Sequence, residues 1–312
     1  MVLYLPDDVL EAMEIAPSDI ADAIEAALIA KSDGALHVTP KSALLPGGGR
    51  YMMSTLAVGD VTVVKQVTVS PDNPPRGLPA INGAIMVLDA ETGLLRALMG
   101  ANWITAHRTA ALSAVAARRL ADPASSTVAF IGCGVQARSH LRAFAALFPL
   151  KTVVGFGRTA ATVDGFLEHA SALGFETRHA ETAEDALREA DIVVTSITLN
   201  YETAPFLSAS WLKPNAFAAI TDLCIPWVDE AMDKFGSVVV DDMEQERTSE
   251  KPMLAPDLIA GDLTDLVTGK LNTPDMDKPR AFAFRGIALG DYAAAALALR
   301  HAEETGAGQQ IA

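Results

Sequence analysis

Residues 127–140 read TVAFIGCGVQARSH, an apolar run that leads into the pattern Gly-x-Gly-x-x-Ala. In this pattern Gly132 allows a tight turn, Gly134 lets the backbone approach a pyrophosphate, and Ala137 keeps the following helix close to the strand. Backbone N–H groups at the start of such a helix favour an anion. The stretch therefore predicts a strand, a turn and a helix that together bind a dinucleotide.

The end of the next predicted strand, residues 154–159 (VGFGRT), indicates which dinucleotide binds. NAD sites usually carry Asp or Glu at this point, hydrogen-bonded to the 2′-hydroxyl of the adenosine ribose. No acid is present here, and Arg158 with Thr159 offers a planar cation and a hydroxyl that suit a 2′-phosphate. NADPH is the expected cofactor; NADH is the alternative if Arg158 only lies on the solvated surface.

The sequence changes character near residues 121–126 (ADPASS). Upstream, the patterns predict a helix over 17–31, a long Ala-rich helix over 104–120, and strands at 50–56, 60–69, 84–88 and 94–98. Downstream, short apolar runs alternate with helical stretches, which implies βαβ units and a parallel sheet. The predicted fold class is α/β. A Rossmann doubly wound domain spans 113–291, and a discontinuous α+β substrate-binding and dimerisation domain spans 1–112 and 292–312.

Composition excludes several classes of function. The chain has 312 residues, half of them hydrophobic, and its formal charge of −15 disfavours binding to nucleic acid. Two cysteines, Cys133 and Cys224, are too few for a disulfide framework or a four-ligand zinc site. We therefore expect no metal and a reducing, cytoplasmic location. Without a basic amino terminus or an apolar run of about 20 residues, no signal peptide or membrane anchor is expected.

Further motifs surround the glycine pattern along the chain. An apolar strand that carries Lys65 leads into PDNPPRGLP (71–79), LDAETG (88–93) and ITAHRTAA (104–111); VVDDMEQ (239–245) and GIALGD (286–291) follow later. In this combination the sequence resembles the ornithine cyclodeaminase and mu-crystallin family over almost its whole length. That family includes cyclodeaminases, ketimine reductases, alanine dehydrogenases and a crystallin that binds NADPH. The resemblance therefore implies the fold and the cofactor class more narrowly than the substrate.

The resemblance also implies roles for two cations. Lys65 corresponds to the lysine that contacts the substrate carboxylate and the reacting nitrogen, and Arg108 corresponds to the arginine that clamps the carboxylate. A guanidinium that makes two hydrogen bonds would orient C2 of a 2-keto or 2-imino acid toward a nicotinamide. Lys65 lies on a mostly apolar strand, so we expect desolvation to lower its pKa toward the range useful for proton transfer.

Asp222 follows the apolar run 216–221, at the carboxyl end of a predicted strand, where doubly wound sheets place ligands. The resembling family has an aspartate there, which assists hydrolytic chemistry in cyclodeaminases and is usually followed by a Pro-Gly-Lys type turn. Residues 222–227 read DLCIPW instead. This departure puts a cyclodeaminase role in doubt, while Asp222 stays a predicted catalytic residue that binds the amine or relays a proton.

Lys41 and Arg50 discriminate between substrates within the resembling family. Relatives that cyclise ornithine carry an acid where Arg50 falls, whereas alanine dehydrogenase-like relatives pair a lysine near Lys41 with an arginine near Arg50. A desolvated arginine would repel the second ammonium of ornithine. We expect Lys41, Arg50, Lys65 and Arg108 to surround a small anionic keto or imino acid.

The predicted function is an NAD(P)H-dependent reductase of cyclic ketimines, of the pyrroline- or piperideine-2-carboxylate type, or of small 2-imino or 2-keto acids. Hydride is delivered to C2. One alternative is an NAD-dependent cyclodeaminase that releases ammonia; another is a non-catalytic, crystallin-like protein that binds NADPH and a small ligand. We expect a homodimer. The predicted catalytic residues are Lys65 and Asp222, and the predicted cofactor-binding residues are Thr109, Gly132, Gly134, Val135, Gln136, Ala137, Arg158 and Thr159.

Overall fold

The computed structural model describes residues 1–272 and 275–311. They form two compact units, Met1–Arg108 with Gly286–Ala312, and Thr109–Arg285. The sequence predicted divisions at 112/113 and 291/292. By packing, Asp291 belongs to the first unit, whereas the predicted division placed it in the dinucleotide-binding domain.

The first unit is built on a mixed sheet. Lys65 lies on its buried face, because Val61, Val63, Lys65 and Val67 alternate with more exposed residues along one strand. Most neighbouring strands are antiparallel, and β1 pairs in parallel with β7. In spatial order the strands are β16 (Gln309–Ile311), β1 (Val2–Leu5), β7 (Leu95–Gly100), β6 (Ile81–Asp89), β5 (Val61–Val69), β4 (Arg50–Val58) and β2 (His37–Val38), with β3 (Ser42–Gly47) paired to β4.

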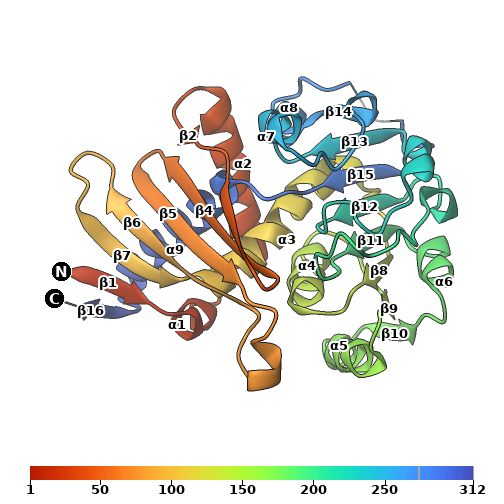
Figure 1. Cartoon of the computed structure of the whole chain (residues 1–312), viewed down its shortest axis with the longest axis horizontal. Helices are drawn as coiled ribbons and strands as arrows, with labels where there is room; N and C mark the ends of the chain where they lie inside the picture. The colour runs from red at the N-terminus through yellow and green to blue at the C-terminus, as the bar shows by residue number, and fades with distance from the viewer. Residues whose placement is uncertain (273–274, 312) are drawn as a thin grey trace. The chain divides into compact units, whose positions relative to one another are not determined.

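Helix α9 (Ala288–Thr305) packs on β4, β5 and β6 and against helix α2 (Pro17–Ser32) (Figure 1). Its alanines let the helix lie close to the sheet, and Gly306 ends it in a left-handed conformation. The unit also contains α1 (Asp7–Ala12), a 3-10 turn η1 (Pro74–Arg76) and the first residues of α3 (Ala101–Leu120). An Asp7 carboxylate oxygen caps α3 by accepting the Trp103 N–H at 2.8 Å.

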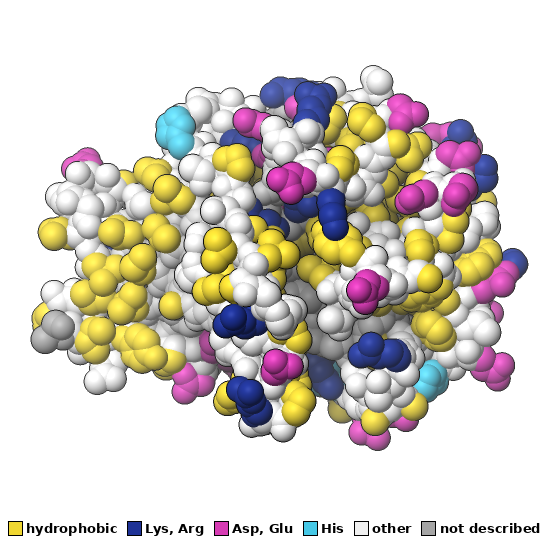
Figure 2. All heavy atoms as spheres, in the orientation of Figure 1, with side chains coloured by type: hydrophobic (Ala, Val, Ile, Leu, Met, Phe, Trp, Pro, Cys, Tyr) yellow, Lys and Arg dark blue, Asp and Glu magenta, His cyan; other side chains and the backbone are white. Residues whose placement is uncertain are grey.

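The opposite face of this sheet carries a row of apolar side chains. The strand registers place Tyr4 opposite Leu98, Leu98 opposite Met86, Met86 opposite Val64, and Val64 opposite Leu56. Tyr4, Met86 and Leu56 are 37–41% exposed. Figure 2 shows hydrophobic side chains gathered over this sheet. We call these five residues the sheet row.

The second unit contains a sheet in which every described pair of strands is parallel. The order confirms the predicted doubly wound Rossmann fold, with the usual reversal between β8 and β11. One arrangement was not predicted: β15 lies between β12 and β13. The spatial order is β10 (Glu176–His179), β9 (Thr152–Phe156), β8 (Thr127–Ile131), β11 (Ile192–Thr195), β12 (Phe217–Ile220), β15 (Arg280–Ala283), β13 (Ser237–Val240) and β14 (Ile259–Asp262).

The helices of this unit follow its strands. Helices α4 and α5 pack together, and α6 contacts β8 and β9 (Figure 1). Every residue of β11, β12 and β15 is buried, as expected for strands covered on both faces. The helices are α4 (Val135–Ala145), α5 (Ala160–Ala172), α6 (Ala183–Arg188), α7 (Met243–Thr248) and α8 (Leu263–Val267), with 3-10 turns η2 (Ala209–Trp211), η3 (Asp229–Lys234) and η4 (Pro256–Leu258).

Candidate functional site

A buried charged cluster lies in the first unit, where β4, β5, α3 and α9 each contribute one side chain. Lys65 Nζ donates to Asp291 Oδ1 at 2.8 Å, and Arg108 Nε lies 3.0 Å from the same oxygen. Thr55 Oγ1 donates to Asp291 Oδ2 at 3.0 Å. The side chains of Lys65 and Asp291 are only 3% and 2% exposed. Two cations therefore share one carboxylate in a site from which water is largely excluded.

Burial and charge act in opposite directions on these groups. Burial is the largest influence on Lys65, and it lowers the pKa of Lys65 to about 8, although the Asp291 carboxylate opposes this and Arg108 and Lys41 reinforce it. Burial on its own raises the pKa of Asp291. The charges of Lys65 and Arg108 and the hydrogen bonds from Lys65 and Thr55 outweigh it and hold the pKa of Asp291 below its ordinary value. The expected lowering of the Lys65 pKa is therefore what the structure shows.

The structure brings three of the four predicted substrate-binding cations together. Lys41 is half-buried and close enough to Lys65 to affect its pKa. Arg50 is exposed at the start of β4 and donates from Nε to the Gly47 carbonyl at 3.4 Å. In the register of β4 and β5, Thr55 lies opposite Lys65, and both side chains point to the same face of the sheet. Arg50 lies five residues before Thr55 on β4, about 16 Å along the strand, so alternation turns its side chain to the other face of the sheet. Within this unit Arg50 does not join the cluster.

The glycine turn of the second unit has the geometry that a dinucleotide needs. Gly132 has φ 92°, and a Cβ there would lie 2.6 Å from the Ser196 carbonyl oxygen, so only glycine fits. Gly134 is exposed and precedes α4, with no heavy atom within 4 Å of where its Cβ would be. Ala137 is fully buried, which lets α4 pack closely on the sheet.

A second observation supports the fit of a dinucleotide to this turn. Gln136 Oε1 is buried and has no hydrogen-bond partner among residues 1–272 and 275–311. The neighbouring Val135 side chain is 68% exposed, so the first turn of α4 is open on one side. Gly132, Gly134, Val135, Gln136 and Ala137 therefore fit a pyrophosphate held by the start of α4. Thr109, another predicted cofactor contact, is buried in α3.

Arg158 and Thr159 follow β9 and are both exposed. Thr159 immediately precedes α5, and its hydroxyl makes no capping hydrogen bond there. A helix start, a hydroxyl and a guanidinium thus lie next to one another in the chain, at the carboxyl end of the second Rossmann strand. This combination suits a phosphate dianion better than a ribose hydroxyl.

Asp222 lies just beyond β12 and is fully buried. Its Oδ1 accepts the Thr195 hydroxyl at 2.9 Å, and its Oδ2 accepts the Ile197 N–H at 3.1 Å. Burial raises the pKa of Asp222 to about 7, because these two neutral donors only partly offset the loss of solvent. Leu223 and Cys224 have φ of 59° and 58°, a left-handed conformation that is rare for side chains other than glycine. The turn that departs from the resembling family is thus also unusual in its backbone.

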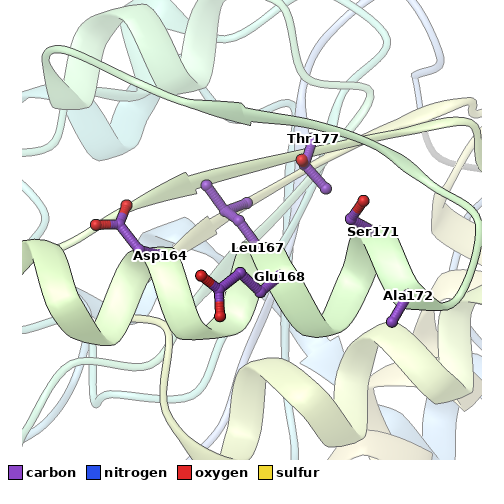
Figure 3. A pocket seen from close by; sticks show the side chains of 6 residues that line it. All are labelled: Asp164, Leu167, Glu168, Ser171, Ala172 and Thr177. Carbon is purple, nitrogen blue, oxygen red and sulfur yellow. The ribbon is translucent and has the colours of Figure 1, made fainter.

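Other candidate features of the second unit do not form a site. Burial raises the pKa of Cys133 to about 11, which makes it unreactive. A shallow depression on α5 and β10 carries two carboxylates and no cation; it is lined by Asp164, Leu167, Glu168, Ser171, Ala172 and Thr177 (Figure 3). In the described part of the chain, no group of three or more His, Cys, Asp or Glu side chains is placed to hold a metal ion. Nor does any helix there have the length and apolarity needed to cross a membrane.

Asp291 and Thr55 are two members of the cluster that were not predicted from the sequence. Asp291 ended a quoted motif, but its partners are 183 and 226 residues away in the sequence, so no local pattern joins them. One signal was available: an acid in the first turn of a helix that is otherwise rich in alanine. Such an acid is stabilised by the helix dipole, yet its burial depends on what the helix packs against.

Comparison with known proteins identifies the family of this chain. The model of the ornithine cyclodeaminase/mu-crystallin family matches residues 3–306. The chain belongs to this family. Ketimine reductase mu-crystallin from Rattus norvegicus is 31% identical over 245 residues, which cover 77% of this chain and 76% of the relative. The predicted family resemblance is confirmed.

Two solved structures share the fold over nearly the whole chain. Thermococcus litoralis Δ1-pyrroline-2-carboxylate reductase in complex with NADH and L-proline has a TM-score of 0.89 at 23% identity, covering 99% of this chain and 100% of that one. An archaeal alanine dehydrogenase dimer with bound NAD has a TM-score of 0.88 at 24% identity, covering 100% and 99%. These likenesses confirm the two-domain α/β fold with its Rossmann-type sheet.

Proposed function

We propose that this protein is an NADPH-dependent reductase of small cyclic 2-imino acids, of the pyrroline- or piperideine-2-carboxylate type. The class of enzyme follows from the family, whose matching members include oxidoreductases of imines and amino acids. The observation that carries the finer proposal is the buried cluster, in which Lys65 and Arg108 share one carboxylate. The positive charges of Lys65 and Arg108 would attract the carboxylate of such a substrate.

Arg108 would bind the substrate carboxylate. Its guanidinium is a planar fork of five N–H donors, and Asp291 Oδ1 lies against the Nε side. A guanidinium can orient a planar carboxylate through two parallel N–H···O hydrogen bonds. Lys41, which is close to Lys65, would add to the positive field that the carboxylate enters.

Lys65 would hydrogen-bond the imine nitrogen and give it a proton. A pKa near 8 keeps most of the ammonium form at neutral pH while making the proton easier to release than from an ordinary lysine. When bound, reduced nicotinamide supplies the hydride. The balance is one hydride to C2 and one proton to nitrogen, which turns the C=N bond into CH–NH.

In the second unit, the turn at Gly132 and Gly134 would hold the pyrophosphate, and Arg158 with Thr159 would bind the 2′-phosphate. Asp222 would relay a proton or bind the product amine, since its pKa near 7 lets it exist in both forms close to neutral pH. Protonated Asp222 could donate to the Thr195 oxygen that its carboxylate now accepts from. The role proposed for Asp222 thus rests on its hydrogen bond with Thr195 and on a pKa near neutral pH.

The decisive test is an assay that follows the absorbance of NADPH. We expect loss of absorbance with Δ1-pyrroline-2-carboxylate or Δ1-piperideine-2-carboxylate, and a weaker response with pyruvate plus ammonia. Lys65→Met should lower kcat roughly 10³-fold, as expected when a group that transfers a proton is lost. Lys151→Met, which alters an exposed lysine, is the matched control. Ammonia release without net cofactor change would instead identify a cyclodeaminase, and nucleotide binding without turnover would identify a carrier.

Cofactor preference depends on Arg158. We expect Arg158→Ala to lower kcat/KM for NADPH by about 10- to 100-fold and to leave NADH almost unaffected, because one charge-assisted phosphate contact is worth about 1.5–3 kcal/mol. Lys151→Ala, at the other end of β9, is the control. Equal kcat/KM values for NADPH and NADH in the unaltered protein would contradict the NADPH proposal.

We further propose that a second copy of this chain packs on the sheet row. An exposed apolar row across five strands is a typical interface, and the archaeal alanine dehydrogenase of this fold is a dimer. Met86→Glu should convert the protein to a monomer in sedimentation. Leu94→Glu, in an exposed turn outside the row, should leave the oligomeric state unchanged. A monomeric unaltered protein would overturn the proposal.

A further inference from the structure

Asp291 contacts two of the four predicted substrate-binding cations, Lys65 and Arg108. Lys65 Nζ and Arg108 Nε lie 2.8 and 3.0 Å from the same oxygen, while the Thr55 hydroxyl holds the other oxygen at 3.0 Å. A carboxylate anchored at both oxygens cannot rotate freely. Asp291 therefore holds the side chains of Lys65 and Arg108 in fixed positions relative to each other.

The charged groups around Lys65 come from two helices and from the loop before β3. Asp291 on α9 favours the ammonium form of Lys65, whereas Arg108 on α3 and Lys41 before β3 disfavour it. Asp291 is the single negative charge in this set. Burial also acts against the ammonium form. Without Asp291, every remaining influence in the set would drive Lys65 toward the neutral amine.

We propose that Asp291 is a positioning residue: it keeps Lys65 in the ammonium form at neutral pH and fixes the orientation of Arg108 for the substrate carboxylate. The mention of a substrate rests on the proposed function. The effect on Lys65 does not, because it follows from contacts within this chain alone.

The placement of Asp291 explains how such a group is kept charged in the interior. It lies in the first turn of α9, where the helix dipole stabilises a negative charge. The terminal segment of the chain returns to the first unit and brings this turn against the strands that carry Thr55 and Lys65. The cluster is therefore complete only when the last helix is docked.

The first test measures the titration of Lys65 without any substrate. The pKa of its amine is followed by 15N NMR of labelled lysine side chains, with the Lys65 signal assigned by its loss in Lys65→Met. Asp291→Asn should lower the Lys65 pKa by about one unit or more. Asp291→Glu, which keeps the charge, should restore most of it, and Thr55→Val should shift it little.

The second test uses turnover. In Asp291→Asn the high-pH limb of kcat/KM should move to lower pH by the same amount as the NMR titration, and KM should rise because Arg108 loses its anchor. A merely structural role would lower the melting temperature and leave both titrations in place. If Asp291→Asn does not fold, Asp291→Ser removes the same charge and leaves room for water.

The results separate the two proposals. A folded Asp291→Asn or Asp291→Ser protein whose Lys65 titrates within about 0.3 unit of the unaltered protein would overturn the role of Asp291. If no imine is reduced but Lys65 shifts as expected, the proposed function fails and the role of Asp291 in holding the Lys65 proton stands.

Discussion

Asp291 in the first unit and Asp222 in the second are equally buried, yet their acidities move in opposite directions. Asp291 has two cations and a hydroxyl around it, and the pKa of its carboxyl is held low. Asp222 accepts only a hydroxyl and an N–H, and the pKa of its carboxyl rises to about 7. Burial penalises both charges, so the charge of the neighbours decides which acid stays ionised.

This difference in pKa gives the two aspartates different chemical roles. A carboxylate that never titrates near neutral pH serves as a fixed counter-charge. A carboxyl that titrates near pH 7 can exchange a proton with a ligand. Three experiments can break or sharpen this contrast.

The largest effect is expected for Asp291→Ala. This change leaves Lys65 and Arg108 buried without their shared counter-charge, which should cost about 3–5 kcal/mol of stability at pH 7. Thermal unfolding against the unaltered protein measures it. A loss below about 1 kcal/mol would show that the cluster is more hydrated than the contacts indicate.

Asp222→Asn should have a smaller effect whose sign depends on pH. The folded protein binds the Asp222 proton more tightly than the unfolded chain does, so the unaltered protein loses stability as pH rises from about 4 to about 7. The amide variant lacks this loss. Its stability relative to the unaltered protein should therefore rise by up to about 1.4 kcal/mol per pH unit over that range.

Melting temperatures at pH 5, 6 and 7 are sufficient for this comparison, with Asp191→Asn as a matched control. Asp191 is a half-buried acid of the same unit whose pKa is lowered: burial raises it, but Lys213 and the N–H groups of Ser126 and Thr127 outweigh that effect. Both the folded and the unfolded chain keep Asp191 ionised above about pH 5, so the stability of its amide variant relative to the unaltered protein should stay nearly constant from pH 5 to 7. Parallel curves for the two variants would show that Asp222 does not titrate in this range.

The smallest effect compares two threonines in matched positions. Thr195 and Thr55 each donate one hydroxyl hydrogen bond to a buried aspartate, at 2.9 and 3.0 Å. Thr195→Val should raise the pKa of Asp222 by about half to one unit, because a hydrogen bond to the charged form is lost. Thr55→Val should leave activity between pH 6 and 8 nearly unchanged, since Asp291 stays ionised beside two cations. The pH profile of kcat/KM distinguishes the two variants. If the profile shifts in Thr55→Val but not in Thr195→Val, Asp291 and not Asp222 is the carboxyl that titrates near neutral pH.

Several features could be predicted from short stretches of sequence because the physics there is local. Gly132 and Gly134 occupy a turn whose backbone geometry follows from the residues themselves. The burial of Lys65 follows from the valines that alternate with it along one strand. The position of Asp222 just beyond the carboxyl end of β12 follows from the apolar strand that precedes it.

Other features could not be read from the sequence because they depend on distant contacts. Arg50 was grouped with Lys65, but the pairing of Thr55 with Lys65 sets a register that turns Arg50 to the other face. The insertion of β15 between β12 and β13 also had no sequence signal. Strand order and register depend on pairing between segments that are far apart in the chain.

The sequence by itself determined the parallel Rossmann fold, the glycine turn and the family, since each depends on short local motifs that can be read along the chain. Only the tertiary structure decided that Asp291 is the counter-charge of Lys65 and Arg108. It also decided that two equally buried aspartates differ in acidity. The physical reason is that a pKa depends on which charges the fold brings within a few ångströms, and sequence distance does not limit that.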